Sequence, residues 1–281
     1  MIRADEPREA KTRGALVRVN LVQVAYGDHE PPAARLKRVV DLALDAPAAD
    51  LIVLPELWTA GGFDYAHWKE RSEPLDAQFV RTMSDLARRT GSTVHGGSFI
   101  ESSGDSYFNT SVVFGADGGL RATYRKMHRF GSGEKTMLDA GARIKTVPLE
   151  LGSATRRVGL ATCYDLRFPE LFRALVDAGS EFFIVPAAWP AARISHWEAL
   201  GRARAIENQA FVLQCNTAGT HAGVQMGGRS QVIGPGGELL AAAGEGEEVL
   251  SVDLQPDAVR DLRSGFDVLA DRRIGIGHAT V

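Results

Sequence analysis

Cys163 is the residue of this 281-residue chain whose setting most suggests chemistry. It follows the apolar run 158–162, which predicts a strand, and Pro169 shortly after it suits the first turn of a helix. Backbone N–H groups and the helix dipole at such a turn stabilise a thiolate, so we expect a lowered pKa for Cys163 and an oxyanion site at the N–H of Tyr164. The turn alone also fits a small buried apolar side chain, the commoner role of a free cysteine.

Three charged residues lie where they can assist such a nucleophile. Glu56 follows the apolar run LIVLP, so it is expected to be partly buried, as a general base or in a structural ion pair. Lys126 ends the predicted strand GLRATYRK, a position that an exposed lysine also fits. Glu134 lies in the glycine-rich loop GSGEK, where a solvated charge is the simpler interpretation. The second cysteine, Cys215, lies inside FVLQC and is interpreted as a buried apolar residue.

Motifs for other chemistries are missing from the sequence. The seven histidines show neither HxH nor HExxH spacing, which argues against a zinc site. GSGEK lacks the spacing of a phosphate-binding loop, GxSxG is absent, and no GxGxxG follows the first predicted strand. The candidate chemistry therefore remains with the cysteine and the charged residues.

The composition bounds the class of protein. The chain is 44% apolar and 24% charged with a net charge of −3, which predicts a globular protein that binds neither nucleic acid nor anionic membranes. No apolar run approaches the roughly 20 residues that span a bilayer. The two cysteines suggest no disulfide framework, so a reduced, cytoplasmic protein is expected. Residues 1–14 are predicted to be a flexible tail and residues 15–281 a single domain.

Two segments of the chain share a strand–helix–strand layout. In the first, a strand at 17–25 leads through a helix at 33–44 to the strand LIVLPELW. In the second, the strand at 158–162 leads through a helix that begins at Pro169 and ends near Gly179 to the strand FFIVPAAW. Such units predict parallel strand pairing. Further strands are expected at 93–101, 107–116, 119–126, 211–217, 228–233, 238–240 and 249–254, with a hairpin turn at 234–237, and further helices at 76–90 and 195–209.

Together, Glu56, Lys126 and Cys163 lie in blocks that resemble the nitrilase superfamily of carbon–nitrogen hydrolases. The blocks are LIVLPELW, YRKMHRFGSGE, GLATCYDLRFPELFRAL and HWEALGRARAIENQAFVLQCN, and the resemblance extends from about Val17 to Arg273. It implies an α/β fold, a four-layer αββα sandwich of two similar βαβ-containing halves. It also implies that no metal or organic cofactor is used, and that the chain forms a homodimer or a larger homo-oligomer.

The resemblance implies a role for each residue of the family's Glu–Lys–Cys set. Glu56 takes the thiol proton as Cys163 attacks a carbonyl, and Lys126 and the N–H of Tyr164 stabilise the oxyanion. Ammonia or an amine leaves, and Glu56 then activates water against the thioester. Glu134 matches a second glutamate that positions the lysine and the substrate.

The block CYDLRFPEL is most similar to the branch of ω-amidases and deaminated-glutathione amidases, in which the arginine at the position of Arg167 is associated with a substrate carboxylate. A guanidinium suits a carboxylate physically, although Arg167 can equally pair with Asp165 or Glu170. Residues 59–68 are expected to line the pocket with Gly61, Gly62, Phe63, Tyr65 and Trp68. Trp189 and His196 are expected at the same mouth, or alternatively in the core and on the surface.

Three functions follow as hypotheses. The first is hydrolysis of the terminal amide of a small carboxylate-bearing compound through a Cys163 thioester, with release of ammonia. The second keeps the chemistry but acts on an N-carbamoyl compound or an aliphatic amide; a nitrilase is disfavoured because CYDLR differs from the CWE-type context usual there. The third is a catalytically silent binding protein on the same fold, which is disfavoured because every catalytic position is filled.

Overall fold

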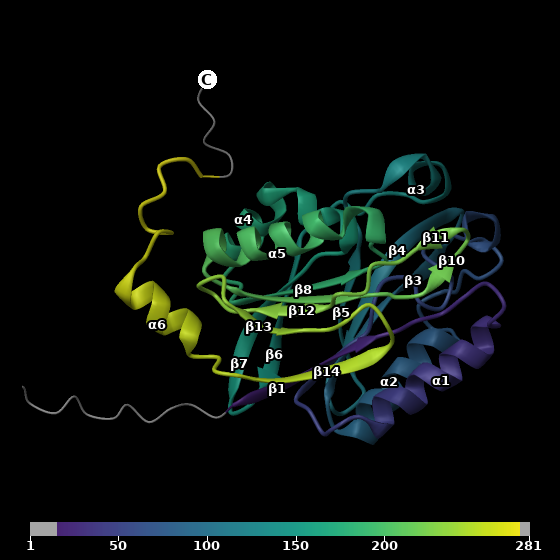
Figure 1. Cartoon of the computed structure of the whole chain (residues 1–281), viewed down its shortest axis with the longest axis horizontal. Helices are drawn as coiled ribbons and strands as arrows, with labels where there is room; N and C mark the ends of the chain where they lie inside the picture. Colours follow the sequence, from purple (N-terminus) through teal and green to yellow (C-terminus); the bar gives the residue numbers. More distant parts are fainter. Residues whose placement is uncertain (1–15, 276–281) are drawn as a thin grey trace, which may run out of the picture.

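The computed structural model describes residues 16–275, and within them two six-stranded sheets carry most of the regular structure (Figure 1). The first sheet has the strand order β14-β1-β2-β3-β4-β5. Its strands are β1 (Val17–Gln23), β2 (Leu51–Val53), β3 (Thr93–Ser103), β4 (Ser106–Phe114), β5 (Leu120–Arg125) and β14 (Glu248–Leu254).

The second sheet has the order β13-β12-β9-β8-β7-β6. Its strands are β6 (Lys145–Leu151), β7 (Ala154–Leu160), β8 (Phe182–Ala187), β9 (Phe211–Asn216), β12 (Gln231–Ile233) and β13 (Leu239–Ala242). A small ribbon pairs β10 (Thr220–His221) with β11 (Val224–Gln225). The predicted turn between β12 and β13 is confirmed, since Gly237 N–H donates to the carbonyl of Gly234 at 2.9 Å.

The two predicted strand–helix–strand units are confirmed. β1 pairs in parallel with β2 across helix α1 (Pro32–Asp45), and β7 pairs in parallel with β8 across helix α4 (Pro169–Asp177). Each helix begins at a proline, whose missing N–H is no loss in the first turn. Helices α2 (Gln78–Thr90) and α5 (Ile194–Asn208) complete the two halves.

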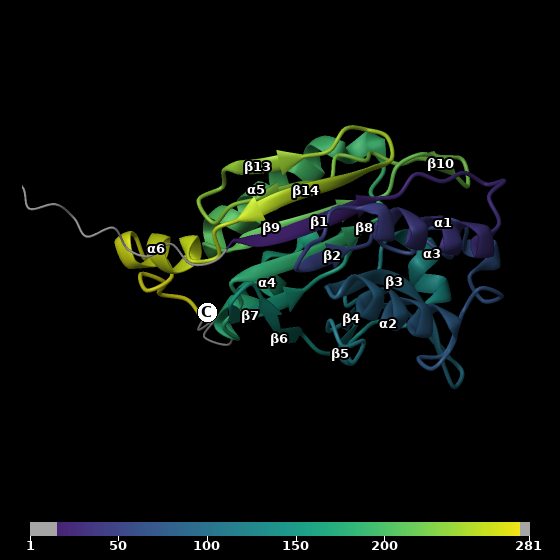
Figure 2. The ribbon, with the colours of Figure 1, turned by 90° about the horizontal axis from the view of Figure 1, so that it is seen from below.

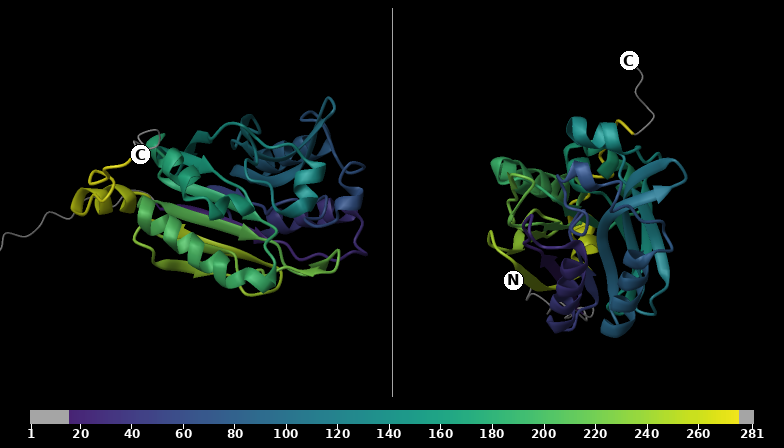
Figure 3. Two further views of the ribbon diagram at one scale, coloured as in Figure 1. Left: turned by 90° about the horizontal axis from the view of Figure 1, so that it is seen from above. Right: turned by 90° about the vertical axis from the view of Figure 1, so that its right-hand side faces the viewer.

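Alternating side chains build the layers. On β8, Phe182 and Ile184 enter the core between the sheets, whereas Phe183 and Val185 pack under α4 and α5. Val22 and Ile52 likewise face α1 and α2 behind the first sheet. In Figures 1, 2 and 3, α4 and α5 run together along one outer face and α1 and α2 along the opposite one. The predicted four-layer sandwich is therefore confirmed.

Several elements differ from the prediction. Strand β7 begins four residues before the predicted 158, and it pairs with β6, which was not predicted. Pro148 within β6 is tolerated because β6 is the edge strand of its sheet. The segment around Glu134 is not a loop but helix α3 (Gly131–Met137), and helix α6 (Ala258–Gly265) was also not predicted.

Some predictions lie outside what the structure describes. The tail at 1–14 falls before residue 16, and the division into one domain at 15–281 and the cytoplasmic location stay predictions. No helix between residues 16 and 275 is long and apolar enough to cross a membrane. Over the same residues, no cluster of three or more His, Cys, Asp or Glu side chains is placed to hold a metal ion.

Candidate active site

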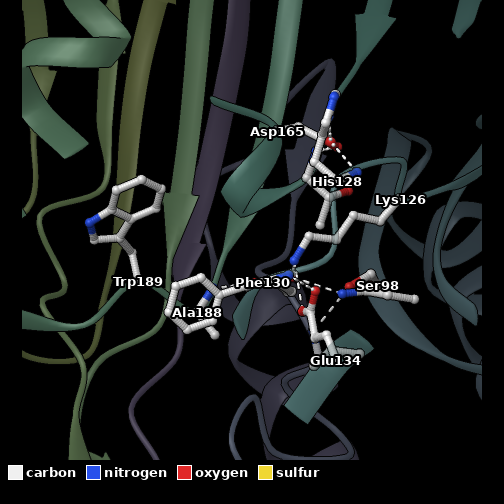
Figure 4. Close-up of polar contacts among 12 residues, drawn as sticks. Ser98, Lys126, His128, Phe130, Glu134, Asp165, Ala188 and Trp189 are labelled. Atoms are coloured by element: carbon white, nitrogen blue, oxygen red, sulfur yellow. Dashed lines mark hydrogen bonds and ion pairs between the residues drawn. The ribbon is translucent and has the colours of Figure 1, made fainter. Parts of the chain in front are cut away.

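Lys126 lies at the centre of a buried charge cluster at the end of β5 (Figure 4). Its Nζ is 2.9 Å from Oε1 of Glu56 and 2.7 Å from Oε1 of Glu134. Glu56 Oε1 also accepts a hydrogen bond from Asn109 Nδ2 at 2.8 Å, and its Oε2 accepts the N–H of Ala188 at 2.8 Å. Because all three charged side chains are buried, the cluster is one cation held between two carboxylates.

The charges in this cluster support one another. Burial works against a charged lysine, but Glu134 and Glu56 outweigh it and hold the pKa of Lys126 well above its usual range. Burial raises the pKa of Glu134, while Lys126 and the N–H of Phe130, which donates to Glu134 Oε2 at 2.6 Å, oppose that rise. Lys126 is therefore a cation at neutral pH, with its charge directed into the site.

Cys163 begins the short 3-10 helix η2 (Cys163–Arg167) just after β7. Its φ of 47° lies in the left-handed region, which is strained for a residue with a side chain. The predicted lowering of its pKa is wrong: burial raises the pKa of the thiol well above its usual range, Glu56 adds to the rise, and Lys126 opposes it. Desolvation of the sulfur outweighs what one helical turn supplies, so the resting thiol is protonated and needs a neighbouring base.

Asp165 holds the turn that carries Cys163. Its Oδ2 accepts the N–H of Thr162 at 2.9 Å and the hydroxyl of Tyr124 at 2.7 Å. Its Oδ1 lies 3.0 Å from the backbone nitrogen of His128 and 2.7 Å from His128 Nδ1. Asp165 is fully buried, so this carboxylate ties the cysteine turn to the chain segment that follows Lys126.

The end of β2 that carries Glu56 is fixed by close backbone packing. Gly97 has a φ of 71°, and a Cβ there would stand 1.9 Å from the carbonyl oxygen of Pro55. Leu57 has a φ of 46°, and its N–H donates to Ser98 Oγ at 3.1 Å. A bulge in β3 between His95 and Ser98 makes room for this contact.

A cavity opens over the charge cluster and the cysteine. Its lining combines the cluster with aromatic and cationic side chains: Glu56, Gly62, Phe63, Phe130, Glu134, Cys163, Tyr164, Arg167, Ala188, Trp189, Pro190 and Arg193. The structure thus brings Phe63, Tyr164, Arg167 and Trp189, all of them predicted site residues, together around Cys163. Such a site suits a small ligand with one reactive carbonyl at its buried end.

Arg167 faces the cavity instead of a structural partner. Its guanidinium stacks 4.7 Å from the ring centre of Trp189, and both terminal nitrogens lie 3.3 Å from Nδ1 of His196. Among residues 16–275, no carboxylate lies within 4 Å of it, so the alternative of a pair with Asp165 or Glu170 is wrong. Asp165 is already saturated by other donors.

Four predicted lining residues do not line this cavity: Gly61, Tyr65, Trp68 and His196. His196 is exposed on α5 and reaches Arg167 without lining the cavity. Trp68 is fully buried, and its Nε1 donates to the carbonyl of Gly61 at 2.7 Å. Tyr65 packs edge-on against Trp68, with ring centres 4.7 Å apart, and against Phe63 of the cavity lining, with ring centres 6.1 Å apart. Aromatic residues in one segment cannot all face one side, because the turn directs them apart.

Four further residues of the site were not predicted from the sequence. Asn109 and Ala188 fix the two oxygens of Glu56, and Phe130 and Arg193 line the cavity. Ala188 acts through its backbone, so its identity carries no signal. Asn109 lies beside Thr110 and Ser111 in β4, so its sequence context does not mark it, although as a buried amide it needs a partner.

The chain belongs to the carbon–nitrogen hydrolase family, whose model matches residues 18–264. The predicted membership of the nitrilase superfamily is thereby confirmed, and the protein is a carbon–nitrogen hydrolase. The chain is similar to the 2-oxoglutaramate amidase of Paenarthrobacter nicotinovorans, at 45% identity over 96% of this chain and 94% of that protein. It is also 31% identical to the 2-oxoglutaramate amidase of Bacillus subtilis, over 89% of this chain and 94% of that one.

Solved structures agree with this assignment. Nit3 of Saccharomyces cerevisiae, described as a member of branch 10 of the nitrilase superfamily, superposes with a TM-score of 0.82 at 29% identity, covering 92% of this chain and 97% of its own. A glutamate-to-glutamine mutant of an amidase from Nesterenkonia superposes with a TM-score of 0.80 at 28% identity, covering 93% of this chain and 95% of its own. In that protein the acetamide moiety of fluoroacetamide is added covalently at the active-site cysteine.

Proposed function

We propose that this protein is an amidase of the ω-amidase type, which hydrolyses the terminal amide of a small carboxylate-bearing compound. The observation that carries the proposal is Arg167, a guanidinium that faces the cavity over Cys163 with no carboxylate of the described chain beside it. A substrate carboxylate could accept two parallel N–H···O hydrogen bonds from the guanidinium of Arg167. Relatives named 2-oxoglutaramate amidase and omega-amidase support this substrate class.

We propose that acylation begins with transfer of the Cys163 proton to Glu56. As the proton leaves, the sulfur attacks the amide carbon, a C–S bond forms, and the carbonyl electron pair moves to oxygen. Lys126 and the N–H of Tyr164 donate to this oxyanion. When the oxyanion collapses, the C–N bond breaks, the nitrogen takes the proton from Glu56, and ammonia leaves a thioester on Cys163.

Deacylation uses the same groups with water as the nucleophile. Glu56 takes a proton from water as its oxygen attacks the thioester carbon, and the second oxyanion meets the same donors. The C–S bond then breaks, the carboxylic acid is released, and the Cys163 sulfur recovers a proton from Glu56. Glu134 keeps the ammonium of Lys126 in place throughout, because its Oε1 lies 2.7 Å from Nζ.

The raised pKa of the Cys163 thiol agrees with the proposed roles of Glu56 as the base and Lys126 as the oxyanion donor. A thiol that is protonated at rest stays inert until a substrate carbonyl enters and Lys126 can stabilise the charge that leaves the sulfur. The base must therefore lie next to the nucleophile, and the hydrogen bonds from Asn109 and Ala188 hold Glu56 in that orientation. This arrangement favours concerted proton transfer and attack.

Ammonia release from a panel of amides tests the substrate claim. We expect turnover of ω-amides of dicarboxylic acids, and loss of essentially all of it in Cys163→Ala. Cys215→Ala is the matched control, because Cys215 is fully buried between the sheets with its Sγ 3.3 Å from the carbonyl of Val53. Full activity of Cys163→Ala would refute the nucleophile, and turnover of neutral amides alone would support the aliphatic-amidase alternative.

An intact-mass measurement tests the thioester directly. Acid quenching of the wild type during turnover of a good substrate should reveal protein that carries the added mass of the acyl group. The same quench of Cys163→Ala should show no added mass. An adduct that survives the loss of Cys163 would place the covalent step on another residue.

We also propose that the protein forms a homodimer through the face that carries α5. Ile206 on α5 is 49% exposed and Leu239 on β13 is 55% exposed, and such apolar side chains gain by being covered. Light scattering on the purified protein should give twice the chain mass. Ile206→Glu should shift it to the monomer, and a monomeric wild type would contradict the proposal.

A further inference from the structure

A second arginine, Arg193, lines the same cavity as Arg167. It ends the short 3-10 helix η3 (Ala191–Arg193) between β8 and α5. Its guanidinium lies 5.3 Å from the ring centre of Phe130 on the cavity wall. Its carbonyl accepts the indole N–H of Trp189 at 2.8 Å, so the backbone that presents the side chain is tied to the same wall.

Arg167 and Arg193 differ from the other arginines that stack on aromatic rings. Arg35 lies over Tyr26 and pairs with Glu30, Arg125 lies over Phe108 and pairs with Glu101, and Arg204 lies over Phe172 and pairs with Glu207. Over the described residues, neither Arg167 nor Arg193 has a carboxylate within 4 Å. The two exceptions both face the cavity over Cys163.

Charges at the buried end of the cavity are paired with one another, whereas those at its aromatic wall are not paired within the described residues. At the buried end, Glu56 and Glu134 are matched by Lys126, whose Nζ contacts both. At the aromatic wall, two guanidinium groups have no counter-charge from the described chain. A ligand that carries an anionic or oxo group at its outer end is attracted there, whereas an ammonium at the same place is repelled by both.

We propose that Arg193 is a specificity-determining residue, which together with Arg167 selects substrates whose acid end carries no ammonium group. The inference rests on the proposed function, because it assumes that the acid end of an amide lies at this wall. Arg167 alone would accept any carboxylate. The second guanidinium adds a donor for a neighbouring oxo or carboxylate oxygen, and it penalises the α-ammonium of an amino-acid amide.

Two substrates that differ only at this position provide the test. 2-Oxoglutaramate and glutamine share the terminal amide and the carboxylate, but carry an oxo group or an ammonium next to the carboxylate. The wild type should prefer 2-oxoglutaramate. Arg193→Gln should lower kcat/KM for 2-oxoglutaramate roughly tenfold to a hundredfold, mainly through KM, as expected for a lost charge-assisted hydrogen bond. Its preference for 2-oxoglutaramate over glutamine should fall by at least about tenfold.

Three controls separate charge selection from damage to the site. Butanamide is a neutral amide without an acid end, so Arg193→Gln should lower kcat/KM for butanamide much less than for 2-oxoglutaramate. Arg193→Lys, which keeps the charge, should retain most of the preference against glutamine. Arg89→Gln, an exposed arginine on α2, should change nothing.

The outcomes distinguish this proposal from the one on which it rests. If the wild type hydrolyses 2-oxoglutaramate well and Arg193→Gln keeps the same preference over glutamine, Arg193 does not determine specificity. The same holds if Arg193→Lys loses as much preference as Arg193→Gln. If the wild type hydrolyses neither acid-bearing amide but does hydrolyse butanamide, the result contradicts the proposed ω-amidase function, and with it the role of Arg193.

Discussion

The ends of β2 and β7 occupy matching places in the two halves of the molecule. Each is followed by a functional side chain, but the two side chains are positioned in different ways. Both leave a parallel strand pair through a residue in the left-handed region, Leu57 with a φ of 46° and Cys163 with a φ of 47°. In the first half the strained residue follows the functional one, Glu56. In the second half the strained residue is the functional one.

The supports of the two ends differ accordingly. Glu56 is held directly, by Asn109 from its own sheet and by the N–H of Ala188 from the other half. The turn of Cys163 is held through the carboxylate of Asp165, which accepts the N–H of Thr162. The comparison teaches that the base is fixed by contacts to its own oxygens, whereas the nucleophile is fixed by the backbone around it and leaves its sulfur free to react.

Glu56→Gln should have the largest effect, because it removes the base and places an amide where every neighbour is a donor. We expect kcat to fall by roughly 10²–10⁴. Glu101→Gln is the matched control: Glu101 is also a buried glutamate of the first sheet, paired with Arg125 outside the cavity. It should lower the melting temperature while kcat stays within about threefold. Equal losses of kcat in both variants would mean that Glu56 acts structurally.

Asp165→Asn tests the indirect support of the cysteine. Whichever way the amide is turned, its NH₂ faces a backbone N–H that also donates, from Thr162 on one side or from His128 on the other. The turn should shift and kcat should fall by about tenfold to a hundredfold, since small misplacements of a nucleophile have effects of that order. Tyr124→Phe, which removes one donor and keeps the carboxylate, should lose less. Unchanged kcat in Asp165→Asn would show that the strained turn holds itself.

Gly97→Ala tests the support of β2. The new Cβ would meet the carbonyl of Pro55 at 1.9 Å, so the strand end that carries Glu56 has to move. Gly104→Ala is the matched control, because its φ of 60° is also left-handed but nothing lies within 4 Å. We expect Gly104→Ala to destabilise by about 1 kcal/mol from conformation alone. Gly97→Ala should destabilise more and lower kcat; similar values for both would refute the backbone clash.

The smallest expected effect is a pH dependence of stability from His95, which lies beside the same bulge. Burial lowers the pKa of His95 to about 3, below the roughly 6.5 of an unfolded chain. The unfolded state therefore binds more protons below pH 6.5, and the folded state loses stability as pH falls through that range, by about 1.4 kcal/mol per unit.

Chemical denaturation at pH 6.5 and pH 5.0 measures this slope. His95→Asn, whose Oδ1 can still accept the N–H of Gly97, should reduce the slope. Part of the slope should remain, because burial also lowers the pKa of His221 to about 4. A slope that is unchanged in His95→Asn would contradict the assignment to His95.

Local patterns in the sequence predicted the two strand–helix–strand units. The four-layer sandwich and the roles of the catalytic residues were implied by the resemblance to the nitrilase superfamily. Apolar runs and prolines marked β1, α1, β2, β7, α4 and β8, and strand alternation made the layers. The order of Glu56, Lys126 and Cys163 identified the family. By contrast, β6 and α6 were not predicted, since an edge strand with Pro148 and a short amphipathic helix leave weak periodicity.

Only the tertiary structure decided how the site is charged. The pKa of Cys163 was predicted with the wrong sign because the helix dipole is a local property, whereas the desolvation that outweighs it comes from distant segments. For the same reason the sequence left Arg167 open between a structural pair and a substrate contact, and did not single out Arg193. The sequence determines which ionisable groups the chain contains. Their burial and their neighbouring charges depend on which distant segments fold against them.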